Sequence, residues 1–292
     1  MPAAHPPIQI FVQVVYIKSS VKIIVMKNKI FNQLIFTIVV LVCINTKIYS
    51  QILDKTFGQN GQVLYTVFKP SCSALQPDGK IIVGGGSSVA RFNKDGSLDQ
   101  AFSVINISPG GIYYLYNVIA IVSNSDGSFY TMGQGISNPF YGTICISKFF
   151  SSGKNDSSFG INGTSYTSLQ DDNFYNSFLQ FFNTSQIVIQ SDGKILAGGT
   201  ILKLDGGFSD YYQGVMVRYN KDGSPDTSFG NEGVILQDYS GDEEIDQIIF
   251  ANDEKILSVG DYKSSSSVSR YNTDGSYDKS FGNNGIRSRA HV

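Results

Sequence analysis

Four basic residues of the chain each precede an aspartate by eight positions. The pairs are Arg91 with Asp99, Lys148 with Asp156, Arg218 with Asp226 and Arg270 with Asp278. Four cations around a pore could bind an anion, but a partner of opposite charge at a constant spacing favours an ion pair within each unit. We expect the ion pair, which contributes only about 0–1 kcal/mol where it is exposed.

Two turns, at residues 93–99 and 272–278, carry oxygen-bearing side chains at alternate positions, as a calcium loop does. Both lack the distal glutamate of an EF-hand. Asn and Asp in such turns also cap their own main chain without a metal. We therefore expect neither a metal site nor a cofactor.

Residues for catalysis are sparse. The two histidines, His5 and His291, lie near the ends of the chain, which argues against a Ser-His-Asp triad, a Cys-His pair or a histidine zinc site. A glycosidase needs only two carboxylates. The acidic run at residues 242–246 could supply them, although a solvated loop explains the same residues. We expect a protein without catalytic residues, and a carbohydrate-active hydrolase or lyase is the alternative.

Seven aromatic residues fall in connections whose length differs from repeat to repeat. Connections that core packing does not constrain can hold ligand-binding residues. The rings could bind a glycan or a cell-surface protein, or they could fill gaps between blades. These candidate ligand-binding residues are Tyr113, Tyr114, Tyr116, Phe140, Tyr141, Tyr211 and Tyr212.

An internal repeat positions all of these groups. A turn aspartate is followed seven positions later by glycine in 78–85, 126–133, 192–199 and 253–260, and a basic residue is followed eleven positions later by phenylalanine in 91–102, 148–159, 218–229 and 270–281. Such a period indicates a supersecondary unit whose apolar face is covered by its neighbours.

Each unit has the composition of β-strands. Short runs rich in branched residues, such as 118–122 and 187–189, flank Asp-Gly turns, as in hairpins. Asp253-Glu254 replaces Asp-Gly in the fourth unit, so we expect a looser hairpin there. A third strand follows, and a further glycine turn precedes the fourth.

The sequence thus predicts an all-β fold, a β-propeller-like array of about four four-stranded antiparallel blades, as a single domain at residues 51–292. The partial repeat at 57–61 precedes a candidate strand at 63–68. That N-terminal strand could complete the last blade and close the ring, and residues 286–292 are the alternative source of the strand. An open array is also compatible with four units.

Residues 1–50 are predicted to be an upstream extension plus a signal peptide, the latter at 26–50. A basic segment at 27–29 precedes an apolar run of about 15 residues at 30–44, which is short for a membrane anchor. Removing residues 1–50 leaves 17 basic and 24 acidic side chains, a net charge of −7. This balance disfavours nucleic acid as a partner. We expect a secreted or cell-surface protein with no stable membrane span.

Two cysteines, Cys72 and Cys145, remain in the exported part. They occupy different positions in their repeats, so we expect buried free thiols, with a disulfide as the alternative.

The blocks 76–85 and 218–230, which read QPDGKIIVGG and RYNKDGSPDTSFG, resemble the delta-60 repeat family of exported bacterial proteins. The resemblance spans nearly all of residues 51–285. It is weakest in the second unit, which has Ser128 in place of Lys. In the first unit, Ser103 stands where a glycine follows the other anchor phenylalanines. The resemblance implies a secreted or surface β-repeat protein of poorly defined biochemical role, and it brings no catalytic residues. We expect a protein that binds an unknown ligand, and a structural part of a longer surface array is a further alternative.

Overall fold

The computed structural model describes residues 54–107, 112–137, 141–169, 186–203, 211–237, 244–262 and 265–290. The expected signal peptide lies outside these ranges. The described residues contain no helix that is long and apolar enough to span a membrane.

The described residues form four antiparallel sheets of four strands each, and strands that are consecutive in the chain are neighbours in every sheet. The first sheet comprises β1 (Cys72–Leu75), β2 (Ile81–Gly85), β3 (Ser88–Phe92) and β4 (Ile105–Asn106), and the second comprises β5 (Ile112–Ser123), β6 (Phe129–Ser137), β7 (Tyr141–Phe149) and β8 (Thr164–Ser168). The third comprises β9 (Gln186–Ile189), β10 (Ile195–Lys203), β11 (Tyr211–Tyr219) and β12 (Val234–Leu236), and the fourth comprises β13 (Gln247–Phe250), β14 (Ile256–Tyr262), β15 (Ser265–Tyr271) and β16 (Ile286–Ala290). The expected all-β, propeller-like fold is confirmed.

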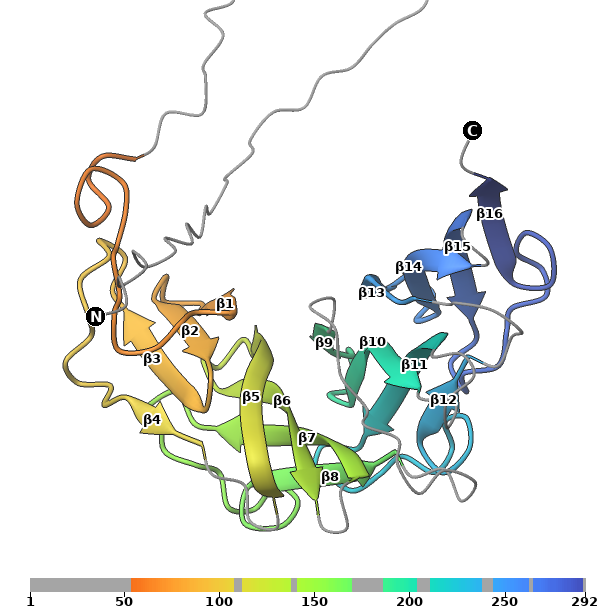
Figure 1. The fold of residues 1–292 in the computed structure, drawn as a ribbon, viewed down its shortest axis with the longest axis horizontal. Helices are drawn as coiled ribbons and strands as arrows, with labels where there is room; N and C mark the ends of the chain where they lie inside the picture. The colour runs from red at the N-terminus through yellow and green to blue at the C-terminus, as the bar shows by residue number, and fades with distance from the viewer. Residues whose placement is uncertain are drawn as a thin grey trace, which may run out of the picture.

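The sheets follow one another along an open arc, with sheet one and sheet four at its two ends (Figure 1). The first strands lie on the inner side of the arc, where β1 contacts β5, β5 contacts β9 and β9 contacts β13. The fourth strands lie on the outer side. Each sheet therefore packs face to face against the next, as the blades of a propeller do.

Among the described residues, the core has three apolar clusters, one for each pair of neighbouring sheets. Ile82 and Phe102 of sheet one pack with Val118 and Phe129 of sheet two. A second cluster joins sheets two and three around Phe159, and a third joins sheets three and four around Phe229. The repeating apolar face of each unit is thus buried by its neighbour, which is why a single unit cannot fold alone.

The turn between the first two strands has the same form in every sheet. Gly79 adopts a positive φ of 82°, and its N–H donates to the carbonyl of Gln76 over 2.8 Å. Glu254 adopts the same conformation with φ 60°, and its bond to Ala251 is 3.0 Å long. The expected loosening of the fourth hairpin is therefore slight, since Glu254 adopts the left-handed conformation that Gly provides at no steric cost.

The predicted closure of the last sheet by residues 63–68 is wrong. The fourth strand of sheet four is β16, the alternative source, which pairs with β15. Residues 63–68 form no strand and lie against sheet one, where the ring of Tyr65 contacts that of Phe92 at 5.2 Å between centroids. The edge that a closing strand would need is already paired, so the array stays open (Figure 1).

Candidate functional site

The repeated basic residues and aspartates form ion pairs within their sheets, as the sequence predicts. The distance from Nε to the aspartate Oδ2 is 2.8 Å for Arg91, 2.6 Å for Arg218 and 2.6 Å for Arg270, and Nζ of Lys148 lies 2.9 Å from Asp156. All four aspartates are only 5% exposed. The pairs are therefore buried on the carboxylate side, and the small contribution expected for an exposed pair does not apply.

Three of the aspartates bind a second cation that the sequence analysis did not assign to them. Nζ of Lys80 lies 2.8 Å from Asp99, that of Lys194 lies 2.8 Å from Asp226 and that of Lys255 lies 2.7 Å from Asp278. The signal was present in the sequence, because each lysine follows the first turn of its repeat. Sheet two has Ser128 at this position, so Asp156 has one cation fewer.

These carboxylates are held ionised. Burial raises the pKa of Asp226, but hydrogen bonds from Lys194, Ser228 and Arg218 outweigh it, and the pKa lies well below its usual value. The hydrogen bond from Lys80 likewise lowers the pKa of Asp99. A general acid needs a raised pKa, so these carboxylates do not suit that role.

The arginines also connect neighbouring sheets. The guanidinium of Arg91 lies over the ring of Phe102 at 4.4 Å, and its Nη1 donates to the carbonyl of Ser151 in sheet two. Arg218 repeats the arrangement with Phe229 at 4.3 Å and the carbonyl of Thr273 in sheet four. Their fork of donors serves the fold, so they do not form an anion-binding ring.

The turns that resembled calcium loops are capped by their own side chains. Asp95 Oδ1 accepts hydrogen bonds from the N–H of Ser97 at 2.9 Å and from its hydroxyl at 2.7 Å. Asp274 and Ser276 do the same. No group of three or more His, Cys, Asp or Glu side chains in the described residues could hold a metal ion. The Asx turn explains these residues.

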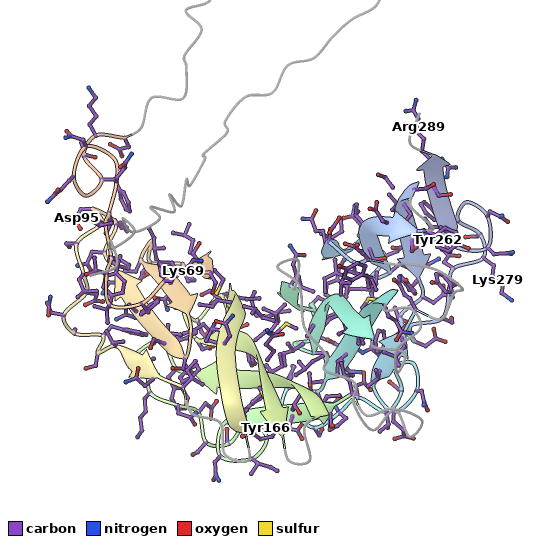
Figure 2. The ribbon with its side chains drawn as sticks, in the orientation of Figure 1. Lys69, Asp95, Tyr166, Tyr262, Lys279 and Arg289 are labelled. Atoms are coloured by element: carbon purple, nitrogen blue, oxygen red, sulfur yellow. The ribbon has the colours of Figure 1, made fainter. Side chains whose placement is uncertain are left out.

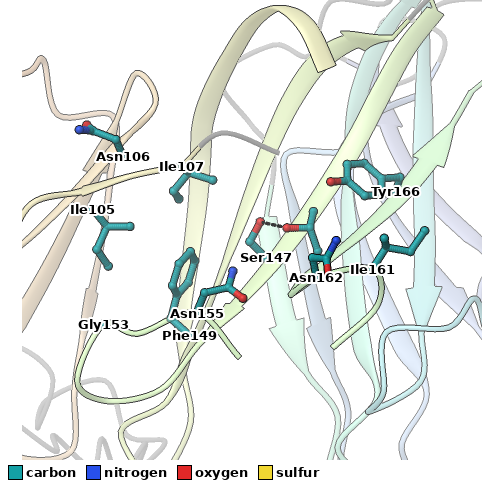
Figure 3. A pocket seen from close by; sticks show the side chains of 11 residues that line it. Ile105, Asn106, Ile107, Ser147, Phe149, Gly153, Asn155, Ile161, Asn162 and Tyr166 are labelled. Carbon is teal, nitrogen blue, oxygen red and sulfur yellow. Dashed lines mark hydrogen bonds between the residues drawn. The ribbon is translucent and has the colours of Figure 1, made fainter. Parts of the chain in front are cut away.

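A groove of about 680 Å³ lies between the outer parts of sheets one and two (Figure 3). Sheet one contributes β4 and the residue after it, and sheet two contributes residues of β7, β8 and the turns beside them. The lining residues are Ile105, Asn106, Ile107, Ser147, Phe149, Gly153, Asn155, Ile161, Asn162, Thr164 and Tyr166.

The groove coincides with a shortened segment in the first repeat. After the anchor phenylalanine, the other units continue with Gly, two residues and Gly, as in 160–163, 230–233 and 282–285, whereas Phe102 is followed by Ser103 and no glycine up to residue 107. In sheets two and three, the N–H of Gly160 and Gly230 donates to the next sheet at Asp222 and Asp274. Among the described residues, Ser103 has no corresponding main-chain bond to sheet two.

The lining of the groove is neutral. It offers the amides of Asn106, Asn155 and Asn162, which are all exposed, beside the half-buried ring of Tyr166. Ser147 and Thr164 bind each other at 2.8 Å in the floor. Amides beside an aromatic ring suit a neutral ligand that carries both hydroxyls and C–H faces. These residues were not predicted from the sequence, although the departure from glycine at Ser103 was a signal for them.

The predicted aromatic residues lie largely in strands, so their expected placement in loops is wrong. Tyr113, Tyr114 and Tyr116 lie in β5, Tyr141 lies in β7, and Tyr211 and Tyr212 lie in β11. Tyr211 pairs with Lys203 and Tyr212 with Leu202 at the far end of the β10–β11 hairpin. The reason is that the longer connections continue as paired hairpin arms. Phe140 lies outside the described residues, and Tyr212 is half-buried.

The acidic run at 242–246, which could supply the carboxylates of a hydrolase or lyase, lies only partly within the described residues. Asp242 and Glu243 of the run at 242–246 lie outside the described residues, whereas Asp246 is exposed.

Comparison with known protein families finds a match to three segments of the repeat array. The family model "Domain of unknown function (DUF5122) beta-propeller" matches residues 76–102, 190–229 and 251–281. Three segments of this chain thus match the DUF5122 β-propeller domain. The DUF5122 segments run from the first turn of a unit to its anchor phenylalanine, in units one, three and four. They leave out the second unit, where Ser128 and Lys148 depart from the pattern.

Solved structures show low similarity to this chain. A protein of unknown function from Bacteroides caccae is 11% identical with a TM-score of 0.32, and the match covers 73% of this chain and 81% of that one. The soluble aldose sugar dehydrogenase of Escherichia coli is 10% identical with a TM-score of 0.42, covering 70% and 60%. The calcium-binding protein regucalcin of Agrobacterium tumefaciens is 16% identical with a TM-score of 0.38, covering 73% and 60%. No curated protein matches the sequence.

Proposed function

We propose that this protein is an exported, non-catalytic binding protein of the delta-60 type, and that the groove between sheets one and two binds a neutral glycan. The observation that carries the proposal is the lining of the groove, which combines three asparagine amides with the rings of Tyr166 and Phe149 and has no charged side chain. Sugars offer hydroxyls to amides and C–H faces to rings, and a neutral site avoids the cost of burying an unpaired charge.

The ion pairs of the four repeated aspartates favour a binding function over a catalytic one. Each repeated aspartate accepts hydrogen bonds or ion pairs from its own sheet, so none of the four is free to act as a general acid or nucleophile. A hydrolase or lyase would need carboxylates elsewhere, such as those at 242–246. We keep that function as the alternative, to be tested by product release from a bound glycan.

The ends of the long hairpins are the second candidate contact surface. The aromatic residues of β5, β7 and β11 reach the side opposite the tight Asp-Gly turns, where a glycan or a cell-surface protein could contact them. Export is supported by the signal-like segment at 26–50, and the net charge of −7 for residues 51–292 argues against nucleic acid. A mass measurement on the exported protein tests the cleavage.

A glycan-binding screen on the chain, followed by calorimetry with the best ligand, tests the groove. Asn162 has a positive φ of 54°, so Asn162→Gly removes the amide while keeping the backbone conformation. We expect this change and Tyr166→Leu each to weaken binding about tenfold, equivalent to about 1.4 kcal/mol.

Asn284→Gly is the matched control, because Asn284 has a φ of 51° at the corresponding position of sheet four and is remote from the groove. If the Asn162→Gly and Tyr166→Leu variants bind as tightly as the unmodified chain, the groove is not the binding site. Loss of binding only in a variant with both Tyr211→Ala and Tyr212→Ala would move the site to the hairpin ends.

A further inference from the structure

Sheet three contacts sheet four through a set of groups of which sheet one has the arginine and sheet two has the glycine N–H. In sheet three, Arg218 donates to the carbonyl of Thr273, the N–H of Gly230 donates to the carbonyl of Asp274 over 2.9 Å, and the ring of Phe229 lies against Gly275. The acceptor is always the turn between the third and fourth strands of the following sheet. We call the arginine, the glycine N–H and the phenylalanine ring of one sheet its donor face. The turn that they contact in the following sheet is the acceptor turn.

The donor face of sheet four is complete, and among the described residues no other sheet covers it, although Arg287 of the same sheet lies 5.6 Å from the centroid of the Phe281 ring. Phe281 is half-buried, whereas Phe229 is fully buried. The side chain of Arg270 is 27% exposed against 4% for Arg218. Arg270 is nevertheless held in place by Asp278 at 2.6 Å and lies 4.7 Å from the centroid of the Phe281 ring. Among the described residues, the N–H of Gly282 has no main-chain acceptor.

At the other end of the arc, a short N-terminal segment, residues 57–63, covers the acceptor turn of sheet one. The N–H of Gly58 donates to the carbonyl of Asp95 over 2.6 Å, and Val63 lies beside Gly96. The segment thus supplies the glycine N–H of a donor face but no arginine. In the described residues, the carbonyl of Lys94, which corresponds to those of Ser151 and Thr273, accepts no guanidinium.

The N-terminal segment is also weakly packed. Phe57 is half-buried, whereas the anchor phenylalanines of sheets one to three are buried. Just beyond the segment, the side chains of Leu64 and Val67 are 78% and 67% exposed. Two matching surfaces therefore lie at opposite ends of one chain, as the positions of Asp95 and Lys279 show in Figure 2.

We propose that the donor face of sheet four docks on the acceptor turn of sheet one in a second copy of this chain and displaces residues 57–63. Arg270 then binds the carbonyl of Lys94, the N–H of Gly282 binds the carbonyl of Asp95, and the ring of Phe281 covers Gly96. The second copy is the occupant because its turn 93–96 offers the same acceptors that sheets two and four offer to the sheets preceding them.

The contact is heterologous, and such contacts form a closed ring or an open filament. Two open arcs joined at both ends leave no donor face uncovered, so we expect a ring of two chains. Displacement is favourable because the incoming sheet supplies a guanidinium that residues 57–63 do not.

Sedimentation velocity over a range of concentrations tests the assembly. Arg270→Lys keeps the pair with Asp278, as Lys148 does with Asp156, but removes the fork of donors that bridges to a carbonyl. We expect it to weaken dimerisation at least tenfold. Gly58→Pro removes the competing N–H donor at a φ of 57°, and we expect it to strengthen dimerisation at least tenfold.

Arg289→Ala removes a cation from β16 that belongs to neither surface, and it should leave dimerisation unchanged. A monomer at every concentration in both the unmodified chain and the Gly58→Pro variant would overturn the proposal. So would dimerisation that Arg270→Lys does not weaken, or that Arg289→Ala weakens equally.

Discussion

The guanidinium of Arg218 binds both Asp226 in its own sheet and the carbonyl of Thr273 in the next one. Nε reaches the carboxylate and Nη1 reaches the carbonyl, so one side chain fixes the turn of sheet three and the position of sheet four. This double role explains why a basic residue recurs at a constant distance from an aspartate. The recurrence reflects how the sheets are joined, and the stability of the array should depend on it.

Arg218→Lys should therefore destabilise the protein more than Arg270→Lys. Lysine can keep the ion pair, but a single ammonium does not reproduce the fork that reaches two acceptors. We expect the free energy of unfolding to fall by about 2 kcal/mol for Arg218→Lys and by less than about 0.5 kcal/mol for Arg270→Lys, whose side chain is partly exposed. Urea unfolding at low protein concentration measures both, and equal losses would contradict the bridging role.

The buried carboxylates should make the fold sensitive to acid. Because the pKa of Asp226 is lowered in the folded state, its contribution is complete above the unfolded value of about 3.9 and is lost as the pH falls through the folded value. We expect Asp226→Asn to cost about 3 kcal/mol at pH 7 and to reduce the slope of stability against pH below about pH 4. Asp246→Asn, at an exposed position, is the control and should keep that slope.

Glycine in the turn between the third and fourth strands should be essential for the contact between sheets. Gly275 has a φ of 86°, and an added Cβ would lie 2.8 Å from the ring of Phe229 and also meet Ile235. Gly86 has a φ of 55° with nothing within 4 Å of an added Cβ. We expect Gly86→Ala to cost about 1 kcal/mol of backbone strain and Gly275→Ala about 3 kcal/mol, since overpacking adds to the strain. Thermal unfolding distinguishes the two.

The two cysteines should react slowly with thiol reagents in the folded protein. Both are free, as expected from their positions in the repeats, and Cys145 is buried whereas Cys72 is half-buried. Burial raises the pKa of Cys72 to about 11 and that of Cys145 to about 12, so the thiolate is scarce at pH 8. We expect both to be titrated only after unfolding in denaturant. Rapid modification of Cys145 under native conditions would show that β7 is less protected than its burial indicates.

The sequence by itself determined the strands, the turns and the ion pairs, because each of these depends on residues close together in the chain. A positive φ at Gly79 and the eight-residue spacing of Arg91 and Asp99 are local requirements, and both are met in the structure. The repeat also determined that the units pack on one another, since the apolar face of each needs cover.

Only the tertiary structure decided what lies between the units. The groove depends on the missing segment after Phe102 facing Phe149 and Tyr166, residues more than 40 positions away. The open arc depends on β16 pairing with β15 before an N-terminal strand could do so. Two segments compete for one edge there, and their spatial proximity decides the outcome, which spacing along the chain does not encode.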